Sequence, residues 1–464
     1  MLHFLVANLD HSMRFSFAAS TPQRSHASKH RTILAAVLIA SAVAQTGAAG
    51  PARDAAVIAV ALPASGAEVA RGAYLARLGD CAACHSVPGS PEFTGGLPLH
   101  SPLGTIYSTN ITPDRDTGIG NYSLHDFDQA LRSGNAPRHR LYPAMPYPSF
   151  AKTSNEDMRA LYAYFMHGVT PVRRTPPKTE LSFPFDQRWG LGVWNLAFLD
   201  AGAYRADPTH DTRWNRGAYL VQSLGHCGSC HTPRGVAYEE RGYTQDSRKY
   251  LAGGISDHWF APNLTGEPAI GLAAWSEADI VRFLKTGHGA GTMAFGPMKQ
   301  VVADSLQHAD AADLTSIAVY LKSLAPGGAP ASFRPLAQPD RTEAWLASGD
   351  VHIPGGGLYS SACAKCHQPD GEGQAGKAPA LARSAVVRAP DPSSVIHIIL
   401  SGGAPHQAPG MAEIDPMPAF DKRLDDREIA EVASFVRRAW GNNAAPVTTR
   451  VVTQMRAALA TESK

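Results

Sequence analysis

The chain has 464 residues, of which 44% are hydrophobic, and its formal net charge is +2. This length suits about three domains of ordinary size. The net charge is too small to indicate a nucleic-acid or strongly acidic partner. We therefore expect a globular chain of several domains that binds no nucleic acid.

The N-terminal segment has the features of a signal peptide. Basic residues precede an apolar run over residues 33–44, which is shorter than the roughly 20 apolar residues of a membrane span. The Ala-Val-Ala sequence at 42–44 is a candidate cleavage site, so residues 1–44 are predicted to be a signal peptide. A second site at 64–67, a start at Met13 and an uncleaved anchor are the alternatives. The prediction implies an exported protein.

All six cysteines lie in three copies of one motif, Cys-x-x-Cys-His. In this motif two thiols bind the two vinyl groups of one haem, and the adjoining His reaches the iron. Disulfides or zinc sites are the alternatives, but neither explains why His directly follows every second cysteine. The sequence therefore predicts three haem c groups, attached at Cys81, Cys84, Cys227, Cys230, Cys363 and Cys366 and ligated by His85, His231 and His367.

The first two haem motifs belong to related units. The sequence Arg-Gly-Ala-Tyr-Leu precedes both motifs, at residues 71–75 and 216–220, and an Asn-x-Thr follows both. Every unit also closes with apolar residues at helical spacing, while strand-like alternation is scarce. The predicted fold is mainly α, with three tandem cytochrome c domains that each wrap one haem. The predicted closing stripes are Met158, Leu161, Tyr162 and Phe165; Leu314, Ile317 and Leu321; and Ile429, Val432, Phe435 and Val436.

Proline clusters mark the boundaries between these units. The predicted domains are residues 66–170, 207–326 and 350–441, with linkers at 171–206 and 327–349 and a C-terminal tail at 442–464. The first linker is too aromatic for a free loop, so we expect interdomain packing there, with partner or membrane docking as the alternative. Its large apolar side chains are Trp189, Trp194, Phe198 and Leu199.

A methionine before each closing helix is expected to be the second axial ligand of the iron, which would raise the reduction potential. Met145 is the only methionine between His85 and the first closing helix. In the third unit Met417 has proline on both sides, which stiffens its loop and favours it over Met411.

The second unit offers two methionines, Met298 and Met293. We favour Met298 because its neighbours resemble the family described below. Four histidines are conceivable axial ligands instead: His125, His139, His288 and His397.

No motif for a separate catalytic centre is present. The sequence Gly-x-Gly-x-x-Gly at 371–376 follows a haem motif and has no preceding strand, so it predicts a loop and no dinucleotide site. A nucleophile elbow, a P-loop and a convincing carboxylate pair are also missing from the sequence. We expect no catalytic site besides the haems.

Several segments resemble the three-haem cytochrome c subunits of membrane-associated bacterial dehydrogenases. These subunits accompany quinoprotein alcohol dehydrogenase and flavin-dependent gluconate, sorbitol or fructose dehydrogenases, and related cytochromes serve molybdenum-dependent aldehyde and nicotinate dehydrogenases. The resemblance runs from about residue 68 to residue 440. The matching segments are residues 71–85, 104–113, 141–150, 214–220 and 275–280.

The resemblance implies an electron-transfer subunit. A dehydrogenase catalytic subunit with flavin, PQQ or molybdenum would oxidise an alcohol, polyol, sugar acid or aldehyde. This chain would then pass the electrons to ubiquinone at the periplasmic face of the cytoplasmic membrane. A peroxidase-like multihaem enzyme and a stand-alone carrier are the alternatives. Peripheral membrane attachment is expected. The C-terminal tail could form a membrane-surface helix, or it could be an ordinary packed or frayed C-terminus; its apolar residues at helical spacing are Val447, Val451, Met455 and Leu459.

Overall fold

The computed structural model describes residues 64–328, 340–349, 353–411 and 413–462. All of these residues belong to one of two structural units of the chain, residues 62–464. The predicted signal peptide at 1–44 and part of the second predicted linker lie outside the described residues. We call residues 66–170, 207–326 and 353–441 segments 1, 2 and 3.

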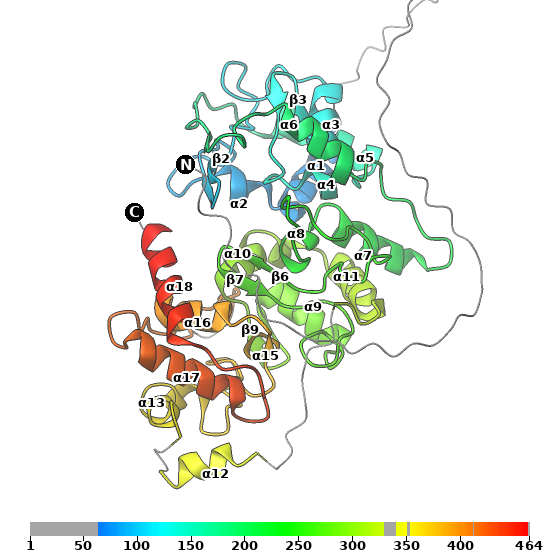
Figure 1. Cartoon of the computed structure of the whole chain (residues 1–464). Helices are drawn as coiled ribbons and strands as arrows, with labels where there is room; N and C mark the ends of the chain where they lie inside the picture. The colour runs from blue at the N-terminus through cyan, green and yellow to red at the C-terminus, as the bar shows by residue number, and fades with distance from the viewer. Residues whose placement is uncertain (1–63, 329–339, 350–352, 412, 463–464) are drawn as a thin grey trace, which may run out of the picture. The chain divides into compact units, whose positions relative to one another are not determined.

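Segment 1 is built from short helices joined by loops and small antiparallel strand pairs (Figure 1). Strand β1 pairs with β2, which pairs with β5 from the following linker, and β3 pairs with β4. The elements are α1 (Gly66–Leu78), α2 (Cys81–His85), β1 (Pro98–Ser101), β2 (Gly104–Tyr107), α3 (Leu124–Ser133), β3 (Asn135–Ala136), β4 (His139–Arg140), α4 (Tyr147–Phe150), α5 (Asn155–Ala163), the π-helical turn η1 (Tyr164–Gly168) and, in the linker, β5 (Glu180–Leu181) and α6 (Gly190–Phe198).

Segment 2 repeats the order of segment 1: a long helix, the haem motif, a strand pair, a helix, a second strand pair and two further helices. This order agrees with the duplication inferred from the sequence. The elements are α7 (Thr212–Gln222), α8 (Gly228–His231), β6 (Gly254–Ser256), β7 (Trp259–Ala261), α9 (Glu277–Thr286), β8 (His288–Gly289), β9 (Thr292–Met293), α10 (Gly296–Asp304), the 3-10 turn η2 (Leu306–His308) and α11 (Ala311–Ser323).

Segment 3 and the tail have helices but no named strand among their described residues. The elements, with α12 from the linker, are α12 (Thr342–Ala347), α13 (Gly356–Ala362), α14 (Ala364–His367), α15 (Ala385–Arg388), α16 (Ser393–Ser401), α17 (Asp426–Arg438) and α18 (Thr449–Glu462). The chain is therefore largely helical, as the sequence predicted.

The three predicted closing helices are all present, as α5 with η1, α11 and α17. The apolar stripes read from the sequence face the core: Met158, Leu314 and Ile429 are each at most 2% exposed. Helix α17 begins with a complete capping box at Asp425, whereas at α5 Ser154 accepts from the Asp157 amide and the Asp157 carboxylate turns elsewhere. The π-helical turn after α5 was not predicted.

Among the described residues, three hydrophobic clusters form the core, one for each segment. Two leucines cross between the first two clusters. Leu78 at the end of α1 belongs to the cluster of segment 2, and Leu224 after α7 belongs to the cluster of segment 1. Segments 1 and 2 therefore pack against each other through these two leucines.

The aromatic linker helix α6 has one packed face and one exposed face. Trp194 packs inward, with its Nε1 donating to the Ala237 carbonyl at 2.9 Å and its ring against Tyr147. Trp189 and Leu196 are 74% and 90% exposed. The prediction that the linker aromatics pack between domains is thus confirmed for Trp194 and wrong for Trp189. A helix of this length can turn only one face to its neighbours.

The C-terminal tail forms α18, which packs against α17 (Figure 1). Val452 and Met455 are buried in the cluster of segment 3, and Arg456 pairs with Asp426 at 2.7 Å. Of the two readings of the tail, the packed C-terminus is correct, because the apolar face of α18 is already covered by the chain itself.

Candidate haem sites

The Cys-x-x-Cys-His motif of segment 1 forms the short helix α2, and those of segments 2 and 3 lie on α8 and α14, with Cys227 and Cys363 as the N-cap residues. The amides of His231 and His367 bond the carbonyls of Cys227 and Cys363, at 2.9 and 3.0 Å. Residues at i and i+3 share one face of such a turn, so the two thiols of a motif point the same way. All six cysteines are free of disulfides, and each motif can hold one porphyrin edge.

The three motif histidines are oriented in the same way. Their Nδ1 atoms lie 2.7, 2.7 and 2.9 Å from backbone carbonyls of Thr109, Pro262 and Pro379. A carbonyl only accepts, so Nδ1 carries the hydrogen and Nε2 keeps its lone pair. Burial lowers the pKa of all three imidazoles, which keeps them neutral. Neutral imidazole with a free Nε2 fits an axial ligand of haem iron.

The thiols fit covalent attachment to an apolar group better than an ionic metal site. Burial raises the pKa of Cys81 and Cys227 to about 12, and that of Cys363 to about 11. Among the described residues, no group of three or more His, Cys, Asp or Glu side chains is placed to hold a metal ion. Each of these three cysteines also packs against the hydrophobic cluster of its segment, where an apolar porphyrin would complete the core.

The predicted axial methionines lie beside the same clusters as the cysteines. Met145 contacts the cluster that Cys81 contacts, and Met417 contacts the cluster of Cys363. A two-way backbone bridge to Gly403, with both bonds at 2.9 Å, holds Met417 in its loop. These positions are consistent with the prediction for both residues.

The choice between Met298 and Met293 can be made from equivalent positions in segments 1 and 2. The amide of Leu141 bonds the Gly134 carbonyl at 2.7 Å, and the amide of Ala294 bonds the Gly287 carbonyl at the same distance. Met145 lies four residues after Leu141, and Met298 lies four residues after Ala294. Met293 lies in β9, paired with His288. The geometry therefore favours Met298.

The four alternative histidines lie in other surroundings. His125 and His139 are exposed. His397 stacks on Trp259 with ring centroids 3.8 Å apart, and His288 Nε2 donates to the His406 carbonyl at 2.8 Å. The latter two serve contacts between segments 2 and 3.

The haem motifs of segments 1 and 2 lie near each other. His226, directly before Cys227, donates from Nε2 to the Gly79 carbonyl at 3.3 Å. Helix α10 of segment 2 also packs against α2. Two haems bound at these motifs would therefore be neighbours.

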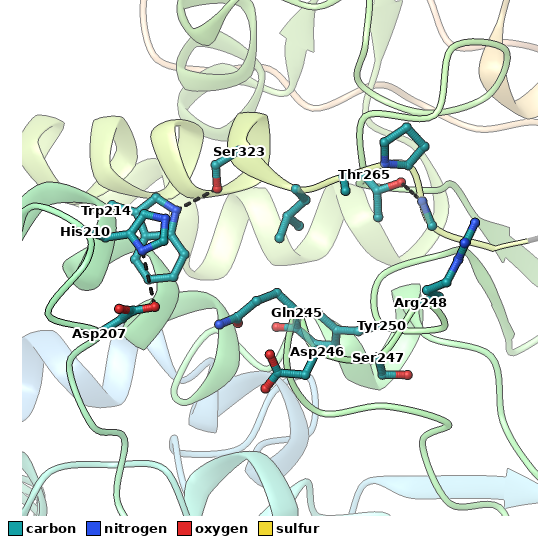
Figure 2. A pocket seen from close by; sticks show the side chains of 14 residues that line it. Asp207, His210, Trp214, Gln245, Asp246, Ser247, Arg248, Tyr250, Thr265 and Ser323 are labelled. Atoms are coloured by element: carbon teal, nitrogen blue, oxygen red, sulfur yellow. Dashed lines mark hydrogen bonds and ion pairs between the residues drawn. The ribbon is translucent and has the colours of Figure 1, made fainter. Parts of the chain in front are cut away.

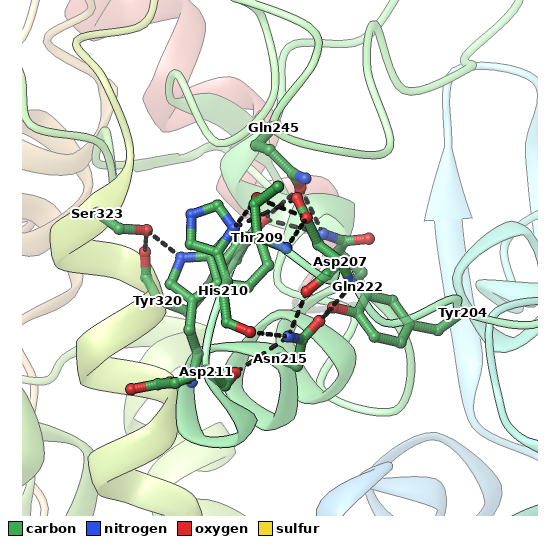
Figure 3. Close-up of polar contacts among 11 residues, drawn as sticks. Tyr204, Asp207, Thr209, His210, Asp211, Asn215, Gln222, Gln245, Tyr320 and Ser323 are labelled. Atoms are coloured by element: carbon green, nitrogen blue, oxygen red, sulfur yellow. Dashed lines mark hydrogen bonds and ion pairs between the residues drawn. The ribbon is translucent and has the colours of Figure 1, made fainter.

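A cavity of about 350 Å³ opens beside α7 and α11 (Figure 2). His210 stacks on Trp214 with centroids 3.8 Å apart and lies 3.3 Å from Asp207. Behind them Asn215 bonds Tyr204 and the Asp207 amide, as Figure 3 shows. This network ties the linker to α7.

Cys-x-x-Cys-His motifs at short helices, each with a His whose Nε2 is free and a Met beside one small core, are the features of a c-type cytochrome. A cytochrome c family model matches residues 354–440. The chain is 46% identical to a gluconate 2-dehydrogenase cytochrome c subunit of Pantoea cypripedii, over 85% of this chain and 90% of that protein. It is 44% identical to the cytochrome c subunit of a quinone alcohol dehydrogenase of Gluconacetobacter polyoxogenes, over 85% of each chain.

A fructose dehydrogenase cytochrome subunit of Gluconobacter japonicus is 40% identical, over 84% of this chain and 82% of that protein. The chain thus belongs to the family of cytochrome c subunits of gluconate, alcohol and fructose dehydrogenases. Members of this family are electron-transfer components and not catalytic subunits, as predicted.

The sequence did not predict the polar contacts that join segments 1 and 2. The residues that make them are Arg71, Tyr74, Asp157, Arg216, Tyr219 and Asp313. The two arginines and the two tyrosines could have been found, because they lie in the repeated Arg-Gly-Ala-Tyr-Leu sequence. The carboxylate partners were hidden, since Asp157 matched an ordinary capping pattern.

Proposed function

We propose that this chain is a three-haem relay, which carries electrons from a dehydrogenase catalytic subunit to ubiquinone at the periplasmic face of the cytoplasmic membrane. Each haem iron would accept and release one electron at a time. The observation that carries the proposal is the threefold recurrence of one arrangement: a Cys-x-x-Cys-His turn, a His with Nδ1 bonded to a carbonyl, and a Met beside the same core.

The three segments would each be one cytochrome c domain. The axial pairs would be His85 with Met145, His231 with Met298, and His367 with Met417. A methionine beside every site argues against a peroxidase-like function, which needs an open position on one iron. The chain's residues therefore support electron transfer better than peroxide chemistry.

The partner is proposed from the relatives, whose names place them with gluconate, alcohol and fructose dehydrogenases. We propose a catalytic subunit of the flavin, PQQ or molybdenum type acting on an alcohol, polyol, sugar acid or aldehyde. Such cofactors release two electrons, which a series of one-electron centres can remove in turn.

Peripheral membrane attachment is proposed through the exposed face of α6 and the loop before it. Trp189, Val193 and Leu196 follow helical spacing and are 74%, 62% and 90% exposed, and Phe183 is 80% exposed. The opposite face is held by Asn195, which bonds Tyr147 at 2.6 Å. Apolar and aromatic side chains on one face of a fixed helix suit insertion at the level of the lipid headgroups.

No helix among the described residues is long and apolar enough to cross a bilayer. Attachment at the surface, after export directed by residues 1–44, is the form of membrane association that we propose.

The function is tested by affinity purification of the tagged chain from detergent-solubilised membranes. We expect a stoichiometric dehydrogenase subunit with its cofactor, and haem bands that are reduced when that subunit's substrate is added. A haem-loaded chain that is recovered alone, and that stays oxidised with every dehydrogenase substrate, would contradict the proposal. A variant with Cys227→Ala and Cys230→Ala should retain two of three haems, as measured by intact-protein mass.

A further inference from the structure

The first helices of segments 1 and 2 exchange equivalent tyrosines. Tyr74 on α1 donates to Oδ2 of Asp313, near the start of α11, at 2.8 Å. Its counterpart Tyr219 on α7 donates to Oδ2 of Asp157, near the start of α5, at 2.6 Å. Both tyrosines occupy the same place in the repeated Arg-Gly-Ala-Tyr-Leu. This is the reciprocal pattern of an interface between two equivalent surfaces related by a two-fold axis.

Each tyrosine also completes the helix cap of the other segment. The amide of Ser154, the N-cap of α5, donates to the Tyr219 hydroxyl at 3.2 Å, and the amide of Asp310, the N-cap of α11, donates to the Tyr74 hydroxyl at the same distance. In an ordinary capping box the side chain at N3 fills this role. Here the N3 carboxylates are engaged elsewhere, so each closing helix depends on its neighbour for a complete cap.

The two carboxylates are buried and paired. Asp157 and Asp313 are 1% and 8% exposed. Arg71 donates to Asp157 at 2.7 Å, and Arg216 donates to both oxygens of Asp313, at 2.8 and 2.7 Å. A buried carboxylate that has all of its partners in place has few alternative arrangements, because any shift would leave a buried charge without a partner. We call the two Arg–Asp–Tyr triplets the crossed clamp.

The crossed clamp lies on the helices that lead into both haem motifs. Below Tyr74 the chain runs through Leu78, whose carbonyl accepts from Ser305 Oγ at 3.2 Å, and Gly79, whose carbonyl accepts from His226 Nε2 at 3.3 Å. His226 directly precedes Cys227. A continuous set of cross-segment contacts therefore runs from the clamp to the residues that precede Cys81 and Cys227.

We propose that Tyr74 and Tyr219 are positioning residues that hold the haem motifs of segments 1 and 2 at one separation and one orientation. A fixed arrangement of α2 and α8 would keep the two haems in register for direct electron exchange. This positioning of the two motifs requires only that haem is attached at Cys81, Cys84, Cys227 and Cys230. That the two haems take part in a relay rests on the proposed function.

The test uses the full, haem-loaded chain with Tyr74→Phe, Tyr219→Phe and both changes together. Two porphyrins held at a fixed angle couple their Soret transitions, which gives a two-signed circular dichroism band. We expect this band to weaken in each single variant and most in the double variant, while haem content and the axial-ligand absorbance stay unchanged. Tyr162→Phe is the matched control, because Tyr162 bonds the Tyr122 carbonyl inside segment 1 at 2.9 Å.

Two results would overturn the proposal. One is a two-signed band that keeps the same shape and amplitude in the double variant as in Tyr162→Phe, even if the double variant unfolds at a lower temperature. The other is a loss confined to haem content or ligation. Failure to find a dehydrogenase partner would leave this measurement untouched, so the positioning and the relay are tested separately.

Discussion

Asp157, which opens the closing helix of segment 1, accepts a hydrogen bond of 2.6 Å from Tyr219 of segment 2. Arg71 binds the other oxygen of the same carboxylate. We predict that Asp157→Asn lowers the free energy of unfolding by about 2 kcal/mol, because the buried carboxylate loses its charge-assisted hydrogen bonds from Tyr219 and from Arg71, whose side chain is 45% exposed. Chemical denaturation would measure the loss.

The neighbouring Glu156 is the matched control for Asp157. Its side chain is 72% exposed and lies 3.9 Å from Arg71. Glu156→Gln should change the free energy of unfolding by less than about 1 kcal/mol. Equal losses of unfolding free energy in the two variants would show that the buried contact between Asp157 and Tyr219 does not stabilise the fold.

The clamp should also make stability depend on pH. Burial raises the pKa of Asp313, but hydrogen bonds from Arg216 and Tyr74 outweigh burial and lower the pKa below its usual 3.8. A carboxyl with a depressed pKa stabilises the fold above its ordinary pKa, and this contribution is lost as pH falls through the folded-state value. Wild type should therefore lose stability below about pH 4 more steeply than Asp313→Asn. Exposed Asp186→Asn should follow wild type, and parallel curves for all three proteins would refute the prediction.

The close crossing of α1 and α5 requires glycine. A Cβ on Gly72 would lie 1.9 Å from the Ala160 carbonyl oxygen, and a Cβ on Gly217 would lie 1.9 Å from that of Ser316 in segment 2. Gly72→Ala should cost about 1–3 kcal/mol of unfolding free energy, as overpacking does in other cores. Gly66→Ala, with open space around it, should be neutral or slightly stabilising. A thermal melt that ranks the two variants alike would contradict this account.

The axial ligand in segment 2 can be identified by substitution. Met298→Leu should remove the absorbance of methionine-bound iron from one haem and lower that haem's reduction potential, because thioether ligation raises it. Met293→Leu replaces a buried methionine of similar volume in β9 and should leave the potential unchanged. Spectroelectrochemical titration of both variants measures this, and the reverse ranking would make Met293 the ligand.

Local rules predicted much of the fold. The helical stripes around Met158, Leu314 and Ile429 follow from the period of the α-helix, and all three closing helices are present. The haem motifs are local as well, since six cysteines and three histidines identify them without tertiary information. The family assignment followed from such local segments.

Contacts between segments could not be predicted in this way. The pairing of Tyr74 with Asp313 joins residues far apart in the chain, and neither residue is unusual in its own surroundings. The two faces of α6 were equally hidden, because an apolar helix does not reveal which of its faces a neighbour covers. Met298, by contrast, was already favoured over Met293 from its neighbours in the sequence, and the matching backbone bonds in segments 1 and 2 support that choice.

The most direct test of the relay is to mix the purified complex with the substrate of its dehydrogenase subunit in a stopped-flow spectrometer. The haem bands of this chain should be reduced within the enzyme's turnover time and should be reoxidised when a soluble ubiquinone analogue is added. Turnover with quinone while all of the haems remain oxidised would contradict the proposal that this chain carries the electrons.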